Sequence, residues 1–293
     1  MEFTEGVRFD SLHLSPEIIR AIEKRNIEVS TPVQAGCIPP MMDWQDVIAK
    51  APTGTGKTFA YGIPIVEHVD PEDESVQAVI LAPTRELAIQ ITDEIRDLAA
   101  FKPGVRTVCL YGGAPIGRQI DTLKKHPQIV VATPGRLSDH MKRRTVRVDT
   151  AQTVVLDEAD RMLDMGFVHD VKKVIAKLPA QRQNLMFSAT MPKEIEQLAA
   201  GILHDPAFVK VDPVSSTVDR IQQSLYFVEK GNKKFLLPWL IKNLKPEVVN
   251  ALVFSRTKHG ADKIARDLTK QGITAAAIHG NKSQTARVAA LEG

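Results

Sequence analysis

The sequence predicts an α/β fold with an open parallel sheet flanked by helices, on two observations. Short β-branched or apolar runs alternate with helical patterns along the 293 residues, and such alternation is typical of parallel strands joined by crossover helices. A loop of small residues and an acidic segment each directly follow one of these runs. Ligands in open sheets bind beyond the carboxyl ends of the strands, so we expect the functional site there.

The first part of the chain, residues 1–212, is expected to form one complete domain. Between its strands lie amphipathic stretches such as residues 86–99, where Leu87, Ile91 and Ile95 recur at helical spacing. The predicted strands are residues 46–49, 78–81, 107–110, 128–132, 153–156, 184–187 and 208–211.

A polar stretch without periodicity, residues 213–219, is expected to link this domain to a second one. The second part, residues 220–293, is about half as long as an α/β domain usually is. We therefore expect a partial domain that is loosely ordered or associates with another copy, because half a domain leaves a sheet edge and an apolar face uncovered. Its predicted strands are residues 224–228, 251–254 and 274–278, and its predicted helices are residues 233–243, 258–270 and a last one from about Ser283.

Composition limits the class of protein. No apolar run is long enough to span a membrane, and the first five residues are acidic where a signal peptide would be basic, which predicts a soluble cytoplasmic protein without a membrane partner. Two cysteines are too few for a disulfide framework or a zinc site. Residues 213–293 carry 13 Lys and Arg against 6 Asp and Glu. This basic region indicates a polyanionic partner, although solubilising lysines on helix faces give the same sum.

Residues 51–58 read Ala-Pro-Thr-Gly-Thr-Gly-Lys-Thr, which indicates a phosphate-binding loop. Its glycines permit backbone N–H groups to approach phosphate oxygens closely. Lys57 is expected to bridge the β- and γ-phosphates, and Thr58 to ligate Mg²⁺. Ala51 stands where the general pattern has glycine. The expected nucleotide-binding residues of this loop are Thr53, Gly54, Thr55, Gly56, Lys57 and Thr58.

An Asp-Glu-Ala-Asp tetrapeptide, residues 157–160, follows the predicted strand 153–156. Asp157 can reach a hydrated Mg²⁺ ion from the strand end, and Glu158 can position and deprotonate the attacking water. Together with the phosphate loop, this pair predicts hydrolysis of a nucleotide that is bound with Mg²⁺. The two segments resemble those of the DEAD-box ATP-dependent RNA helicases of superfamily 2. The resemblance implies a complete RecA-like domain followed by part of a second one, with ATP and Mg²⁺ as cofactors.

The resemblance assigns roles near the nucleotide. Residues 31–34, preceded by Phe9, are similar to the family's Q motif, which implies that Gln34 reads adenine and that the ring of Phe9 stacks on the base. The segment from Ser188 to Thr190 is similar to the motif that links hydrolysis to strand separation, and its hydroxyls are expected to hydrogen-bond to Asp160. Thr190 could equally cap the helix that follows.

Three segments after successive strands resemble the family's RNA-contacting motifs. A helix N-terminus with an arginine beside it is a good phosphate site, although helix capping explains each threonine equally well when taken alone. Aromatic residues make up only 5% of the chain, so we expect contacts to the RNA backbone with little sequence preference. The candidate RNA-binding residues are Thr84, Arg85, Gly113, Thr133, Arg136, Arg256, Thr257, Gln284 and Arg287.

The printed sequence contains no counterpart of the family's motifs V and VI, which looks like truncation. Motif VI carries arginines that complete the ATP site, and loss of an arginine finger costs about 10³ to 10⁵ in rate. We therefore expect nucleotide binding with slow hydrolysis. A DNA helicase or translocase on the same scaffold is an alternative that Gln34 and Asp160 disfavour. A non-catalytic RNA clamp is another, and intact Lys57 and Glu158 disfavour it.

Overall fold

The structure is a computed structural model that describes residues 5–211 and 222–292. The chain divides into two compact units, Met1–Val218 and Asp219–Gly293. The expected linker, residues 213–219, and the expected domain end at residue 212 lie outside the described residues.

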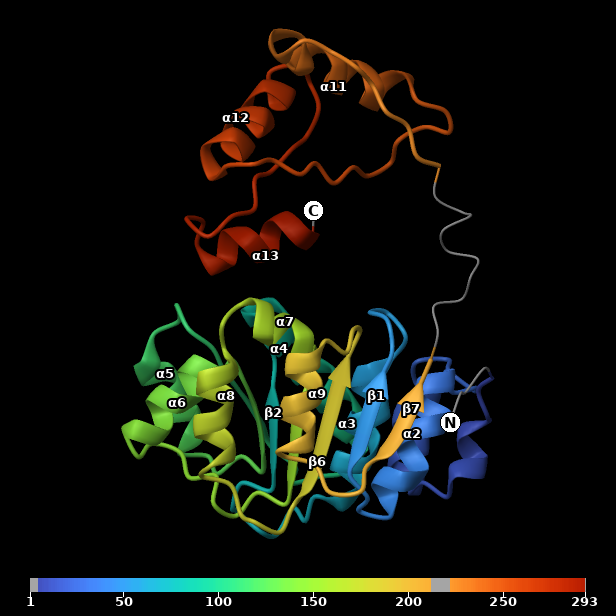
Figure 1. The fold of residues 1–293 in the computed structure, drawn as a ribbon, viewed down its shortest axis with the longest axis vertical. Helices are drawn as coiled ribbons and strands as arrows, with labels where there is room; N and C mark the ends of the chain where they lie inside the picture. The colour runs from blue at the N-terminus through green and yellow to red at the C-terminus, as the bar shows by residue number, and fades with distance from the viewer. Residues whose placement is uncertain (1–4, 212–221, 293) are drawn as a thin grey trace. The chain divides into compact units, whose positions relative to one another are not determined.

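A seven-stranded parallel sheet forms the centre of the first unit (Figure 1). Its strand order is β3-β4-β2-β5-β6-β1-β7. Each strand lies within one residue of its predicted bounds, so the predicted α/β fold with a parallel sheet is confirmed. The strands are β1 (Val47–Lys50), β2 (Ala78–Leu81), β3 (Thr107–Leu110), β4 (Ile129–Ala132), β5 (Thr153–Leu156), β6 (Gln183–Ser188) and β7 (Ala207–Lys210).

Helices cover both faces of this sheet (Figure 1). Side chains that alternate along β2 show the two layers, because Ile80 packs into one hydrophobic core and Val79 into the other. On the Ile80 side lie η1 (Phe9–Leu12), α1 (Pro16–Glu23), α2 (Pro32–Met42), α3 (Lys57–His68), α4 (Arg85–Leu98) and η2 (Ala99–Phe101). On the Val79 side lie α5 (Ile116–Leu123), α6 (Pro134–Lys142), α7 (Ala159–Asp164), α8 (Val168–Ile175) and α9 (Lys193–Ala200).

The central strands read as continuous apolar runs because both of their faces are covered. All residues of β2, β4 and β5 are buried, as expected for a parallel sheet between two helical layers. The faces of the sheet are therefore covered, and the loops at its carboxyl edge are where ligands are expected to bind.

The second unit contains helices but, in the part of it that the structure describes, no strand. The three predicted helices are present as α11 (Lys233–Asn243), α12 (Lys258–Thr269) and α13 (Gln284–Glu292), after η3 (Lys230–Asn232). The predicted strands at residues 224–228, 251–254 and 274–278 were wrong. A strand persists only where a neighbour pairs with its N–H and C=O groups, and these segments have no such neighbour among the described residues.

Few apolar side chains of the second unit are covered. Phe227 and Phe254, expected inside strands, are 93% and 89% exposed. Among the described residues of this unit only Pro238 and Leu268 are buried. Much of the apolar surface of the described part of this unit is therefore exposed. None of the described helices in either unit is long and apolar enough to cross a membrane.

Candidate nucleotide and nucleic-acid site

Three loops that were expected to act on the nucleotide start from neighbouring strands. Strand β6 lies between β1 and β5 in the sheet, and all three run parallel. Their carboxyl ends therefore share one edge. The phosphate loop follows β1, the acidic tetrapeptide follows β5, and the segment 188–190 lies at the end of β6. The fold thus brings together segments more than a hundred residues apart.

The phosphate loop has the backbone conformation that its glycines allow. Gly54 and Gly56 have φ angles of +79° and +85°, in the left-handed region that glycine adopts readily. A Cβ atom on Gly56 would lie 2.5 Å from Nε2 of Gln34, whereas one on Gly54 would meet no atom within 4 Å. Helix α3 starts directly after Gly56 without a side-chain cap. Its first N–H groups lack intrahelical partners and so suit an anion.

Side chains of the loop are arranged around this helix end. Lys57 is buried, and its Nζ donates to the carbonyl oxygen of Ala51 at 3.3 Å. The hydroxyl of Thr55 donates to the carbonyl oxygen of Pro52 at 2.8 Å, which closes the turn. Thr53 is exposed, and Thr58 is half-buried as the second residue of α3. These positions fit a triphosphate over the end of α3 with Lys57 beside it.

Asp157 is buried at the end of β5 and touches the phosphate-loop helix. Its Oδ2 accepts a hydrogen bond from the hydroxyl of Tyr61 on α3 at 2.9 Å, and its Oδ1 accepts one from the backbone N–H of Glu158 at 2.9 Å. Each oxygen keeps a lone pair for another partner. A carboxylate and a threonine hydroxyl are oxygen donors of the kind that Mg²⁺ takes, so the residues present fit the expected ion.

Burial dominates the ionisation of this pair. It raises the pKa of Asp157 to about 6, against the opposing effect of the positive charge of Lys57. Burial, and then the charge of Asp157, raise the pKa of Tyr61 well above its usual value, which keeps its hydroxyl protonated as a donor. The sequence reasoning missed Tyr61. The sequence feature that could have indicated it is its spacing: a tyrosine hydroxyl four residues after Lys57 lies on the same face of the helix as Lys57.

Glu158 has an unusual backbone for a residue with a side chain. Its φ is +50° and its ψ is +53°, in the left-handed region. Its carboxylate pairs with Nη1 of Arg161 at 3.1 Å, and its side chain is 14% exposed against 56% for Arg161. Residues held in such conformations cluster at functional sites, which agrees with the expected role of this carboxylate.

The predicted link between the acidic tetrapeptide and the segment 188–190 is confirmed at Asp160. Its Oδ2 accepts hydrogen bonds from the hydroxyl and the backbone N–H of Thr190, at 2.7 and 2.8 Å. The hydroxyl of Ser188 accepts from the backbone N–H of Asp160 at 3.2 Å and donates to the carbonyl of Thr190 at 2.7 Å. The alternative role of Thr190 was wrong, since α9 has Pro192 at its N-cap.

Gln34 lies against the phosphate loop. Its Oε1 accepts from the N–H of Thr31 at 2.8 Å, and its Nε2 donates to the carbonyl of Gly56 at 3.0 Å. One lone pair and one N–H remain, enough for the edge of one base. The expected stacking of Phe9 on the base was wrong. This ring is 3% exposed and belongs to the hydrophobic core, which leaves no face for a base.

The expected RNA-contacting residues of the first unit meet at the loop after β3. A Cβ atom on Gly113 would lie 2.2 Å from Nη1 of Arg85, so this guanidinium lies against the glycine. Nη1 of Arg136 donates to the carbonyl of Ala114 at 3.2 Å. Strands β3, β4 and β2 are neighbours, which explains why loops from all three converge.

The two threonines of this cluster differ. The Thr84 hydroxyl accepts from the N–H of Leu87 at 3.3 Å and caps α4, so the capping alternative holds for it. Thr133 precedes α6 without a side-chain cap and is 8% exposed. Capping therefore does not explain Thr133.

Four candidate RNA-binding residues belong to the second unit. Arg256 is exposed, and the hydroxyl of Thr257 accepts from the N–H of Gly260 at 3.0 Å to cap α12. Gln284 opens α13, and Arg287 is half-buried on the same helix. The side chain of Gln284 lies outside the described residues.

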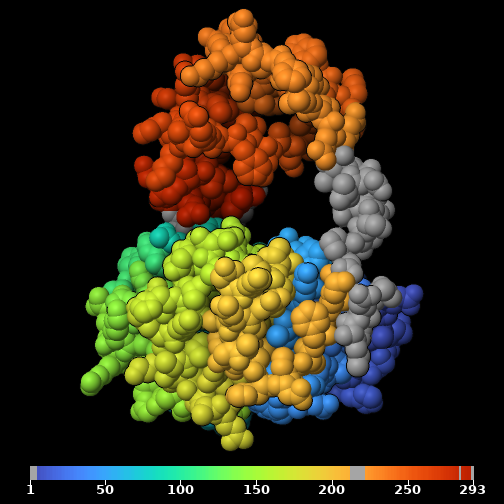
Figure 2. Space-filling view, viewed as in Figure 1, coloured from blue at the N-terminus to red at the C-terminus, as the bar shows by residue number. Residues whose placement is uncertain are grey.

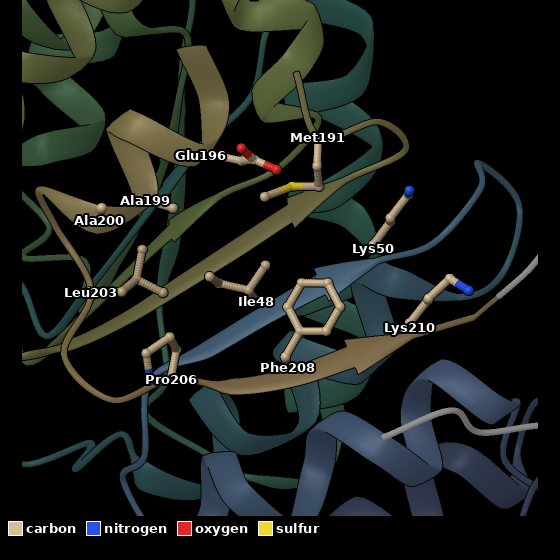
Figure 3. Close-up of a pocket in the computed structure, with 10 residues that line it drawn as sticks. All are labelled: Ile48, Lys50, Met191, Glu196, Ala199, Ala200, Leu203, Pro206, Phe208 and Lys210. Atoms are coloured by element: carbon tan, nitrogen blue, oxygen red, sulfur yellow. The ribbon is translucent and has the colours of Figure 1, made fainter. Parts of the chain in front are cut away.

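A separate hollow lies on the sheet beside α9. It has a volume of about 430 Å³, and Ile48, Met191, Leu203 and Phe208 point into it (Figure 3). Strands β1 and β7 reach the surface here (Figure 2), and Phe208 is 44% exposed. No residue of the phosphate loop lines this hollow, so we do not assign the nucleotide to it.

These features define a phosphate-loop nucleotide-binding domain with a RecA-like sheet. Residues 31–198 match the family described as DEAD/DEAH box helicase. This match covers more than half of the chain, and the chain belongs to that family.

Two bacterial relatives and one solved structure are similar to the chain. The DEAD-box ATP-dependent RNA helicase CshA of Geobacillus kaustophilus is 47% identical over 283 residues, which cover 97% of this chain and 60% of that protein. The protein of the same name from Bacillus subtilis is 44% identical, over 97% and 57% of the two chains. The crystal structure of a DEAD box protein from Methanococcus jannaschii matches with a TM-score of 0.67 and 38% identity, over 99% of this chain and 77% of that one. The chain thus spans about 60% of the length of these bacterial relatives.

Proposed function

We propose that this chain provides the ATP site and part of the RNA-binding surface of an ATP-dependent RNA helicase. The observation that carries the proposal is the hydrogen bond between Tyr61 and Asp157, at 2.9 Å. It joins the helix of the phosphate loop to the acidic tetrapeptide, so one bound nucleotide can touch both. The names of the relatives support ATP and RNA as ligands.

At the ATP site, Thr58 and Asp157 would hold Mg²⁺, which would neutralise charge on the transferred phosphoryl group. Lys57 would leave the carbonyl of Ala51 and contact the β- and γ-phosphates. Glu158 would position the attacking water and take its proton. Gln34, already bonded to the loop, would select adenine.

RNA would bind at the cluster of Arg85, Gly113 and Arg136. Two guanidinium groups and a glycine that allows close approach suit a sugar-phosphate backbone. The hydrogen bonds of Thr190 to Asp160 would transmit changes at the metal to the end of β6. In the whole protein, two RecA-like domains would close around ATP and RNA and separate a short duplex locally.

We further propose that the printed 293 residues alone bind nucleotide but hydrolyse it slowly, and that the second unit associates with another copy. The support for both is the second unit, whose described residues form no sheet and expose Phe227 and Phe254. Light scattering would test the association: a mass equal to the monomer at high concentration would contradict it.

Nucleotide binding is tested with a fluorescent ATP analogue in Mg²⁺. The variant Lys57→Ala should weaken binding at least tenfold, because it removes the cation beside the phosphates. Lys50→Ala is the matched control, since this lysine ends β1 directly before the loop. Equal affinity of Lys57→Ala and wild type would refute the assigned ATP site.

RNA binding is tested by anisotropy with single-stranded RNA and DNA of one sequence. Gly113→Ala should weaken RNA binding, because the new methyl group displaces the Arg85 guanidinium. Gly112→Ala is the control, since its Cβ would lie 3.8 Å from that group, at ordinary contact. Tighter binding of DNA than RNA would favour the DNA helicase, and RNA binding without any ATP turnover in the full-length protein would favour the clamp.

A further inference from the structure

A buried phenol hydroxyl contacts one of the two residues that are expected to hold Mg²⁺. Tyr61 lies on α3, and its side chain is fully buried. Its hydroxyl donates to Oδ2 of Asp157 at 2.9 Å, and Thr58 lies about one turn earlier on the same helix. One polar atom inside the core thus holds the carboxylate that is expected to bind the ion.

Packing fixes the place of this hydroxyl. The ring of Tyr61 meets the ring of Phe187 edge-on, with centroids 5.1 Å apart and an interplanar angle of 62°, a favourable aromatic geometry. Phe187 lies on β6, between the strands that carry the phosphate loop and Asp157. The hydroxyl is therefore held relative to both loops and not merely to its own helix.

The hydrogen bond determines how the Asp157 carboxylate is turned. The terminal torsion of an aspartate is broad and roughly two-fold, so packing alone leaves the carboxylate plane loosely defined. Here Oδ2 is held by Tyr61 and Oδ1 by the backbone N–H of Glu158. Two donors from two different elements fix the plane, and the remaining lone pairs are directed away from them.

We propose that Tyr61 is a positioning residue for Mg²⁺, which orients the Asp157 carboxylate before the ion arrives. This inference rests on the proposed function of the site. In this role Tyr61 would act through Asp157 and would not itself be a ligand of the ion. Removing a group that hydrogen-bonds to a metal ligand commonly lowers the affinity for the metal 10- to 100-fold. A phenylalanine would fill the same space without holding the carboxylate.

The test is a Mg²⁺ titration of nucleotide binding with the variant Tyr61→Phe. Affinity for a fluorescent ADP analogue is measured as Mg²⁺ is raised from zero, with EDTA as the metal-free reference. We expect the variant to need about tenfold more Mg²⁺ for half of the effect, with little change of affinity in EDTA. Circular dichroism verifies that it is folded.

Two controls separate the hydroxyl from packing. Tyr111→Phe removes a phenol hydroxyl elsewhere in the unit and should leave the Mg²⁺ midpoint unchanged. Phe187→Leu disturbs the ring contact but keeps the Tyr61 hydroxyl, so its midpoint should move much less than that of Tyr61→Phe.

Three results would overturn the inference: an unchanged Mg²⁺ midpoint in Tyr61→Phe, an equal shift in Phe187→Leu, or a Tyr61→Phe protein that does not fold. The last would make the hydroxyl a requirement of the core. A wild-type chain that binds no nucleotide would instead overturn the proposed function and this inference with it.

Discussion

Replacing Asp157 by asparagine should change the stability of the nucleotide-free protein more favourably at neutral pH than at acid pH, each time relative to wild type. Burial raises the pKa of this carboxyl from 3.8 to about 6, so the fold favours its protonated form. In the wild-type protein, the protonated carboxyl therefore makes its full contribution to the free energy of unfolding below pH 4. This contribution is lost as the pH rises through about 6. A rise of roughly two units corresponds to about 3 kcal/mol at 1.36 kcal/mol per unit.

Asparagine carries no charge and has no such loss. It has one acceptor oxygen in place of two, so one of the two hydrogen bonds that Asp157 accepts, from Tyr61 or from the Glu158 N–H, is lost at a cost of about 1 to 3 kcal/mol that is similar at both pH values. The free energy of unfolding of Asp157→Asn minus that of wild type should therefore be about 3 kcal/mol more favourable at pH 7.5 than at pH 4.

The assay is urea unfolding in EDTA, followed by the fluorescence of Trp44 in the variant background Trp239→Phe, so that only the first unit is observed. The exposed residue Glu72, changed to glutamine, serves as control and should show little difference between the two pH values. A difference for Asp157→Asn that is the same at pH 4 and pH 7.5 would refute the reasoning, because the buried charge would then cost nothing.

Two further substitutions and one labelling experiment have expected outcomes. Thr190→Val should lower the free energy of unfolding by about 0.5 to 1.5 kcal/mol, since the hydroxyl bond to the partly exposed Asp160 is lost; Thr190→Ser should restore it in the same urea assay. Thiol labelling at pH 8 should modify Cys109 before Cys37, because burial raises the pKa of Cys109 to about 11 and that of the fully buried Cys37 further; faster labelling of Cys37 would contradict this. Gly62→Ala should cost about 1 kcal/mol by thermal unfolding, since its Cβ would lie 2.8 Å from a side-chain carbon of α4, and a stabilised variant would show that the two helices separate easily.

The strands of the first unit were predictable because their signal is local. Residues 78–81 and 153–156 are mostly apolar and rich in β-branched residues, and both are buried on two faces, so composition and burial agree. The phosphate loop and Asp157 were predictable for a related reason, since glycines and strand-end carboxylates are short-range patterns.

Features that depend on contacts between distant segments were not predictable. Phe9 was expected at the nucleotide, but tertiary packing places it in the core. Tyr61 was overlooked because its importance arises only where α3 meets the end of β5. The strands expected around Phe227 and Phe254 failed because β-propensity supplies no pairing partner.

The most direct measurement of the central claim is a crystal structure of the chain with Mg²⁺ and a non-hydrolysable ATP analogue. The account predicts the triphosphate over the first turn of α3, with the ion beside Thr58 and Asp157. A nucleotide bound elsewhere, for example in the hollow between Ile48 and Phe208, or an ion without contact to Asp157 through either oxygen or an intervening water, would contradict it.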